Sequence, residues 1–396
     1  MISRVKWTSL ALGLASGVWP ALVGAESGDS TVPSKETPYV RDAFYVGGKY
    51  EFNQELKGSL FVDDVYVEKL APVGGKTQPY PLVFFHGGGP SGATWLNTPD
   101  NRQGWASYFV DLGYEVYLLD QSGIGRASSN DLAGYPQRFG ATAELAAMVF
   151  TAPERYNLYP QAAKHTQWPG NGTKGDPAFD AFLKTLLPIG GNLTRVEGAI
   201  QTAGCDLLER IGPSYLVGHS SGAPYLPIIS DLCPDRVAGA VNLEPFNTPF
   251  FTFYPAPGRP AWPYGLSNIP LTYDPPIDSA DELETETVGE DSPERRQCVQ
   301  QKAPAKQLVN VSKVPALVVV GEASIHATWD HCVVRYMRQV GISTDFLVLA
   351  KEGILGNGHF FYLEKNNLEI AAIVERWIRK PKPQRDSLEE PKPKQE

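Results

Sequence analysis

The sequence predicts an α/β fold with a mainly parallel central sheet flanked by helices. From residue 81 onward, short apolar runs alternate with segments that can be helical. The run 81–85 is almost continuously apolar, as expected of a strand covered on both faces. The pentapeptide Gly-His-Ser-Ser-Gly at 218–222 lies between an apolar run at 214–217 and a possible helix at 223–232. This order of strand, sharp turn and helix is typical of a nucleophile elbow.

The other elements follow in order within a domain expected to span 41–379. Two β-rich stretches, 44–46 and 60–67, predict an antiparallel opening to the sheet, and Gly212-Pro213 ends the clearest helix. Residues 121–190 are rich in Gly and Pro and are expected to be an irregular, functional insertion. We expect further strands at 115–119, 237–243, 315–320 and 344–349, and helices at 104–112, 196–211, 333–340 and 368–378.

A long excursion follows the strand that ends at Glu244. Residues 245–313 are rich in Pro, acidic and aromatic side chains, and we interpret about 246–313 as a cap over the active site. The alternative is a disordered insert, but the segment carries too many aromatic side chains for solvent: Phe246, Phe250, Phe251, Phe253, Tyr254, Trp262 and Tyr264.

The N-terminus has the pattern of a secretory signal peptide, residues 1–25. Arg4 and Lys6 precede an apolar stretch at 8–18, and small residues at 23–25 predict cleavage after Ala25. A membrane anchor is the alternative, but the apolar stretch is too short and Pro20 interrupts its end. Residues 26–40 are expected to form a flexible leader and 380–396 a charged, disordered tail, so we predict no stable membrane anchor.

Composition also favours export and excludes some partners. The chain of 396 residues carries a net charge of −9, which argues against binding to nucleic acid or anionic membranes. Its four cysteines are an even number, as in disulfide-bonded proteins. Sequons at Asn171, Asn192 and Asn310 predict glycosylation in a eukaryotic host.

Ser220, at the centre of the pentapeptide, is the candidate nucleophile. The Gly-rich run His86-Gly87-Gly88-Gly89 directly follows the strand at 81–85. Such a loop can present backbone N–H groups to an oxyanion, and the residue after the nucleophile supplies the second donor. We therefore expect Gly88 (with Gly87) and Ser221 to form an oxyanion hole.

A serine hydroxyl needs a general base, and His359 is the best of the six histidines. It follows the last expected strand and lies between glycines, in a loop that could aim one side chain. His331, on the preceding helix, is the alternative.

The acid of the catalytic set is open on the residues alone. Glu322 follows the strand at 315–320, where this type of sheet most often carries its acid, whereas Glu244 ends the strand after the elbow unit. Position in the fold slightly favours Glu322, and Asp330 is a third choice.

Several motifs together resemble a known family. They are Phe85-His86-Gly87-Gly88-Gly89 through Trp95, Gly104-Trp105, Tyr108-Phe109-Val110, Gly113-Tyr114, Leu119-Asp120-Gln121-Ser122-Gly123 with Gly125-Arg126, the pentapeptide, Leu243-Glu244-Pro245, 264–276 and Gly356-Asn357-Gly358-His359. The chain resembles the lineage of secreted bacterial and fungal esterases in the α/β-hydrolase superfamily, typified by esterase 713. The likeness covers most of 80–375, whereas 150–190 and 278–291 depart from the pattern.

In that lineage the acid is a glutamate after the strand that follows the elbow helix. The resemblance therefore implies Glu244 as the acid, and this outweighs the argument from position for Glu322.

Two disulfides are expected among three possible pairings. Cys205 lies on the helix before the elbow strand and Cys233 ends the helix after it, so these two can meet. Cys298 in the cap would then pair with Cys332 on the core.

The sequence as a whole predicts a secreted, cofactor-free serine hydrolase that cleaves a carboxylic ester or lactone of medium size and apolar character. An acyl-transfer or cyclisation enzyme of secondary metabolism on the same residues is one alternative. A catalytically silent binding protein of this fold is another. The sequence does not predict an oligomeric state.

Overall fold

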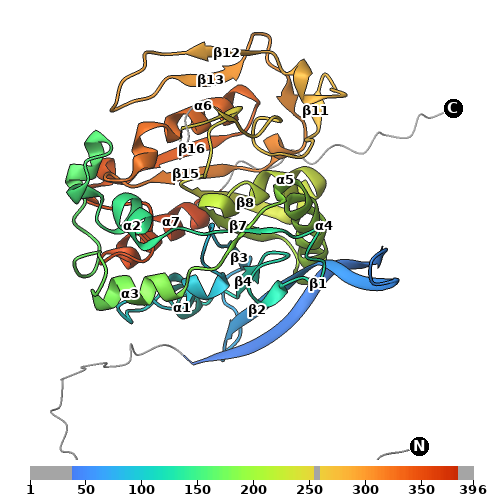
Figure 1. The fold of residues 1–396 in the computed structure, drawn as a ribbon, viewed down its shortest axis with the longest axis horizontal. Coiled ribbons are helices and arrows are strands. Elements are labelled where there is room, and N and C mark those ends of the chain that lie inside the picture. Colours follow the sequence, from blue (N-terminus) through green and yellow to red (C-terminus); the bar gives the residue numbers. More distant parts are fainter. Residues whose placement is uncertain (1–37, 254–258, 382–396) are drawn as a thin grey trace, which may run out of the picture. The chain divides into compact units, whose positions relative to one another are not determined.

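The computed structural model of the protein describes residues 38–253 and 259–381 (Figure 1). The expected signal peptide, all but the last three residues of the expected leader, and the tail from residue 382 lie outside the described residues. No helix in the described part of the chain is long and apolar enough to cross a membrane.

A central eight-stranded sheet has the order β1-β2-β4-β3-β7-β8-β15-β16. The pairs β1–β2 and β2–β4 are antiparallel, and the remaining neighbours run parallel, so the predicted mainly parallel sheet is confirmed. The strands are β1 Tyr39–Asn53, β2 Gly58–Pro72, β4 Val116–Asp120, β3 Leu82–Phe85, β7 Ser214–His219, β8 Val237–Leu243, β15 Ala316–Val320 and β16 Thr344–Val348.

Helices cover both faces of this sheet, which explains its continuously apolar strands. Every residue of β3, β4, β7 and β15 is buried. Alternate residues enter opposite cores: Val83 and Phe85 belong to one, and Leu82 and Phe84 to the other. The first core includes residues of α4 (Leu193–Ile211), α5 (Tyr225–Leu232) and α6 (Asp330–Gln339), and the second includes α1 (Trp105–Asp111) and α7 (Asn367–Arg379).

The 121–190 insertion is more regular than the sequence indicated. It contains α2 (Ala143–Ala146), a π-helical turn at Ala147–Thr151, 3-10 turns at Pro153–Arg155 and Pro160–Lys164, and α3 (Pro177–Lys184). The Asp176 side chain accepts a hydrogen bond from the Phe179 amide at 3.0 Å and caps α3, with Pro177 in its first turn. These elements are too short to show a helical period, so the sequence did not reveal them within an otherwise irregular segment.

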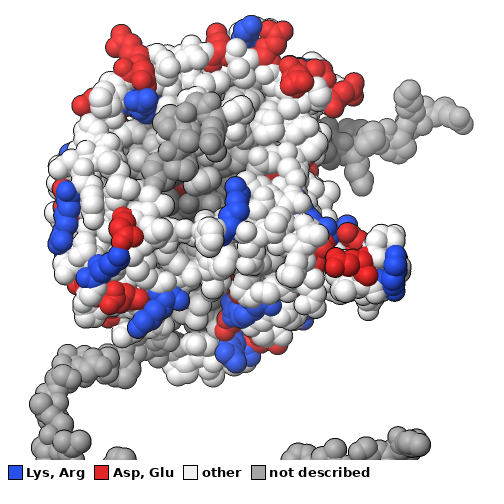
Figure 2. Space-filling view, viewed as in Figure 1, with Lys and Arg blue, Asp and Glu red and all other residues white. Residues whose placement is uncertain are grey.

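The 246–313 segment forms small antiparallel pairs. β9 (Phe251–Thr252) pairs with β10 (Arg259–Pro260), and β11 (Tyr273–Asp274) pairs with β14 (Gln307–Leu308). β12 (Thr285–Val288) and β13 (Cys298–Gln301) form a hairpin beside α6 (Figure 1). Acidic side chains gather over this part of the molecule (Figure 2), where Asp281, Glu282, Glu284, Glu286 and Glu290 are exposed.

Two disulfides join the cysteines in the expected pairing. Cys205 of α4 is bonded to Cys233 after α5, and Cys298 of β13 is bonded to Cys332 of α6. The second disulfide ties the β12–β13 hairpin to the core helix.

Candidate active site

Ser220 lies on a strained turn between β7 and α5. Its backbone has a φ of +50°, a left-handed conformation that is uncommon for a residue with a side chain. The turn is pressed against the end of β3, because a Cβ on Gly222 would lie 2.5 Å from the His86 carbonyl oxygen and 2.6 Å from that of Phe85. Only glycine fits there, so the second glycine of the pentapeptide permits the close approach.

The Gly-rich loop at 86–89 meets this turn. A Cβ on Gly87 would lie 3.0 Å from the Cβ of Ser220, and one on Gly88 would lie 3.2 Å from the Ser221 hydroxyl oxygen. The structure therefore brings Gly87, Gly88, Ser220 and Ser221 close together.

His86 itself is bonded within this loop and to Gln121. Its Nδ1 lies 2.8 Å from the Gly87 carbonyl oxygen, and Gln121 donates a hydrogen bond to the His86 carbonyl at 2.9 Å. The Gln121 side-chain oxygen accepts in turn from the Tyr225 hydroxyl at 2.6 Å. The loop is thus linked to the first turn of α5, the helix that follows Ser220.

His359 and Glu244 form a buried pair beside the turn. His359 Nδ1 lies 2.6 Å from Glu244 Oε2, and their exposed fractions are 3% and 0%. The Glu244 carboxylate also accepts hydrogen bonds from the Gly321 amide at 2.7 Å and the Ser324 hydroxyl at 2.6 Å. Glu244, like Ser220, has a left-handed backbone, with a φ of +47°.

The alternative acid and base residues have other partners. Glu322 Oε1 pairs with Lys164 at 3.0 Å and its Oε2 accepts from the Gly356 amide at 3.0 Å. Asp330 lies 3.0 Å from His326, and His331 Nε2 donates to the Arg296 carbonyl at 3.0 Å. Among the candidates from the sequence, the structure pairs Glu244 with His359.

Burial controls the titration of this pair. Burial lowers the pKa of His359 well below its ordinary value, and the neighbouring His219 and His326 lower it further. Burial also raises the pKa of Glu244 well above its ordinary range, whereas His326 and the hydrogen bonds from Ser324 and Gly321 act in the opposite direction. The imidazole is therefore neutral at rest.

The 121–190 insertion supports the His359 loop, which the sequence did not reveal. Phe150 stacks on the His359 ring, with centroids 5.3 Å apart. His165 lies 2.8 Å from Glu364, whose carboxylate accepts from the Gly358 amide at 3.0 Å. These contacts join residues about 200 positions apart, and no local signal in the sequence pointed to them.

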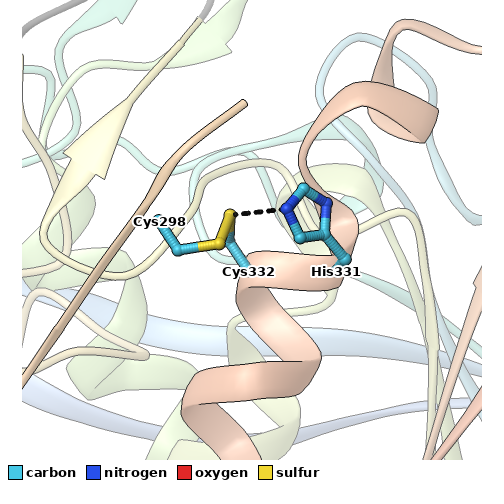
Figure 3. Close-up of side chains that lie close together, drawn as sticks. All are labelled: Cys298, His331 and Cys332. Atoms are coloured by element: carbon cyan, nitrogen blue, oxygen red, sulfur yellow. Dashed lines mark hydrogen bonds between the residues drawn. A yellow bond between two sulfur atoms is a disulfide. The ribbon is translucent and has the colours of Figure 1, made fainter. Parts of the chain in front are cut away.

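Two groups of side chains in the described residues are close enough together to hold a metal ion. One is Cys298, His331 and Cys332, but both sulfurs are already joined in a disulfide (Figure 3), so neither is a free thiolate. The other is Glu244, His326 and His359, whose Glu244 Oε2, His326 Nδ1 and His359 Nδ1 are engaged in the hydrogen bonds described above.

An apolar cavity lies close to the candidate site. Ala223 and Pro224, which follow the turn at Ser220, line it together with Pro245, the neighbour of Glu244. Trp262 and Leu266 from the 246–313 segment close one side. The remaining lining residues include Leu226, Ala240, Val314, Val333, Met337 and Ile342.

Comparisons with known proteins agree with this architecture. A model described as the alpha/beta hydrolase family matches residues 82–373. A protein described as a probable secreted lipase, phiG of Fungal sp. (strain ATCC 74256), is 42% identical over 342 residues, which cover 86% of this chain and 90% of that protein. The solved structure of a novel bacterial esterase superposes with a TM-score of 0.54 at 20% identity, over 87% of this chain and 98% of that chain.

Proposed function

We propose that this protein, which belongs to the alpha/beta hydrolase family, is a secreted serine hydrolase that cleaves carboxylic esters or lactones through an acyl-enzyme. The hydrogen bond between His359 Nδ1 and Glu244 Oε2 is the observation that carries the proposal. It orients a neutral imidazole, and the His359 carbonyl lies 3.0 Å from Nε2 of His219, the neighbour of Ser220. The arrangement matches a nucleophile, acid and base in the chain order of this family.

In the proposed reaction, His359 takes the proton of Ser220 as the serine oxygen attacks the ester carbonyl. Glu244 holds His359 in the tautomer with a proton on Nδ1 and stabilises the imidazolium that forms. The backbone N–H groups of Gly88 and Ser221 stabilise the oxyanion. The alcohol leaves with the proton from His359, and a water molecule activated by the same histidine then releases the acid.

An apolar acyl group fits the surroundings of the site. The cavity that begins at Ala223, Pro224 and Pro245 is lined almost wholly by apolar side chains. This lining favours an apolar acyl group. The relative described as a probable secreted lipase, and the two disulfides, support an ester substrate and export.

Labelling by a fluorophosphonate tests the nucleophile directly, because the reagent bonds covalently to an activated serine. We expect one adduct on wild type by intact mass, located on Ser220 by peptide mapping, and none on Ser220→Ala. Ser128→Ala is the control, since Ser128 is exposed and its hydroxyl bonds only to the Gly125 carbonyl. An adduct retained in Ser220→Ala would refute the assignment.

A panel of p-nitrophenyl esters and simple lactones tests the substrate class. We expect the highest kcat/KM for medium-length acyl chains. A preference for acetate over every longer chain would show that the cavity beside Ala223 does not receive the acyl group.

A further inference from the structure

A second histidine and acid lie against the Glu244–His359 pair. The ring of His326 stacks on that of His359, with centroids 4.6 Å apart and planes 8° apart. Polar atoms of Glu244, His326 and His359 all lie within 4.8 Å of one another. None of the proposed chemical steps uses His326.

Asp330 holds His326 in this place. Its Oδ1 lies 3.0 Å from His326 Nδ1, and the exposed fractions of the two residues are 0% and 4%. The other oxygen of Asp330 has no hydrogen-bond partner among the described residues.

The same short segment also contacts the acid of the proposed triad. The Ser324 hydroxyl donates to Glu244 Oε2 and accepts from the His326 amide at 3.1 Å. The ring of Trp329 packs on His326 at 5.1 Å, and Phe253 from the 246–313 segment stacks on Trp329 at 5.5 Å. His326 is thus fixed from its backbone, its ring face and its Nδ1 atom.

We propose that His326, held by Asp330, is a positioning residue that keeps the Glu244–His359 pair in its active form, a carboxylate beside a neutral imidazole, as the pH falls. The inference rests on the proposed function, in which His359 is the base. Burial lowers the pKa of His326 to about 4, so its ring, held by Asp330, gains a positive charge only in acidic buffer. That charge favours the carboxylate form of Glu244 and opposes protonation of His359.

The other titratable groups facing the pair do not duplicate this effect. His219 contacts the His359 carbonyl through Nε2 at 3.0 Å, and burial lowers the pKa of His219 to about 3. Tyr159 from the insertion donates its hydroxyl to the Ala323 carbonyl at 3.1 Å and remains neutral, because burial raises its pKa. Asp330 acts in the opposite direction from His326, since a second carboxylate raises the pKa of Glu244.

The test is the dependence of kcat/KM on pH, measured on one activated ester with three variants. His326→Phe keeps a flat ring on His359 but removes the nitrogens, so the acid limb should move to higher pH by at least about half a unit. Half a unit is about threefold in kcat/KM at pH values below the limb. His326→Gln keeps a hydrogen-bond donor for Asp330 but cannot become charged, so its acid limb should also move to higher pH. His331→Phe is the control, since His331 precedes Cys332 and contacts Arg296, and its limb should stay in place.

Shifts to higher pH in both His326→Phe and His326→Gln support the proposal, because a residue that only fills space would move neither limb. An unmoved or lowered limb in either folded variant would overturn it. If His326→Phe does not fold, the His326→Gln limb decides. Fluorophosphonate labelling of wild type separates failure of the proposed function from failure of this inference. If wild type is not labelled, the proposed function is wrong. If wild type is labelled but the acid limbs do not move, only the proposed role of His326 is wrong.

Discussion

Replacing Glu244 by Gln should cost far more activity than replacing Glu322 by Gln. Glu244 accepts three hydrogen bonds, from the Gly321 amide, the Ser324 hydroxyl and His359 Nδ1. In Glu244→Gln the side-chain oxygen remains opposite the Gly321 amide, which can only donate. The NH₂ group then faces His359 Nδ1, which must become an acceptor. The ring proton moves to Nε2, and the base that should face Ser220 is lost.

This change of tautomer sets the expected size of the effect. A triad whose acid becomes an amide loses about 10⁴-fold in rate, which corresponds to about 5 kcal/mol in the activation free energy. Glu322→Gln keeps an acceptor for the Gly356 amide and loses only an ion pair with Lys164, whose side chain is 56% exposed. We expect a loss of less than about tenfold there, since exposed ion pairs contribute about 1 kcal/mol or less.

The assay is kcat for both variants and wild type on one activated ester, at equal folded fractions measured by circular dichroism. A large loss for Glu322→Gln with a small loss for Glu244→Gln would refute the assignment of the acid. A small loss for both would show that His359 needs no carboxylate partner.

Four further outcomes are expected. Because burial and neighbouring rings lower the pKa of His359, kcat/KM of wild type should be retained below pH 6.5 and fall only in more acidic buffer; an acid limb at or above pH 6.5 would contradict this. Burial alone would lower the pKa of His165, but Glu154 and Glu364 raise it to about 9. The protonated ring therefore stabilises the fold by up to about 3 kcal/mol, fully below about pH 6.5, and this stabilisation is lost as the pH rises through about 9. The free energies of unfolding of wild type and His165→Gln in urea should therefore become equal at high pH. Cys298→Ala with Cys332→Ala opens a loop of 34 residues, so unfolding should become easier by about 4 kcal/mol and limited proteolysis should cut 278–297 before the core. In a eukaryotic host Asn171→Gln should lose one glycan by mass, because Asn171 carries a sequon and is exposed; an unchanged mass would contradict this.

The sequence predicted the sheet well because its signals are local. Runs such as 81–85 and 315–320 are apolar throughout, and only a strand between two layers of helices satisfies that pattern. The meeting of Gly88 and Ser221 was also predictable, since both follow parallel strands that end at the same edge. Residue type and position did not identify Glu244 as the acid, and only the resemblance favoured Glu244 over Glu322.

The parts of the site that could not be predicted depend on distant pairs. Asp330 was considered only as an acid for His359, yet its partner is His326, four residues along the same chain segment. At such a short separation the two residues could be paired from the sequence, but their stacking on His359 depends on how two loops after different strands meet. Phe150 and His165 lie in a segment whose helical turns are too short to be periodic, so nothing indicated which side chains face inward.

These distant contacts make the position of His359 depend on segments outside the elbow and its own loop. The loop that carries His359 is supported from the insertion through Phe150 and His165, and from the segment after β15 through Ser324 and His326. The nucleophile elbow, the end of β8 and the loop at 356–359 would supply Ser220, Glu244 and His359, but the orientation and charge of His359 depend on residues outside those motifs. A change in the insertion should therefore alter the rate as well as the choice of substrate. Phe150→Ala tests this, since it removes a stacked ring from His359 without touching a charge. We expect kcat to fall by about tenfold with the acid limb displaced little, and unchanged kcat would show that the support from His326 suffices.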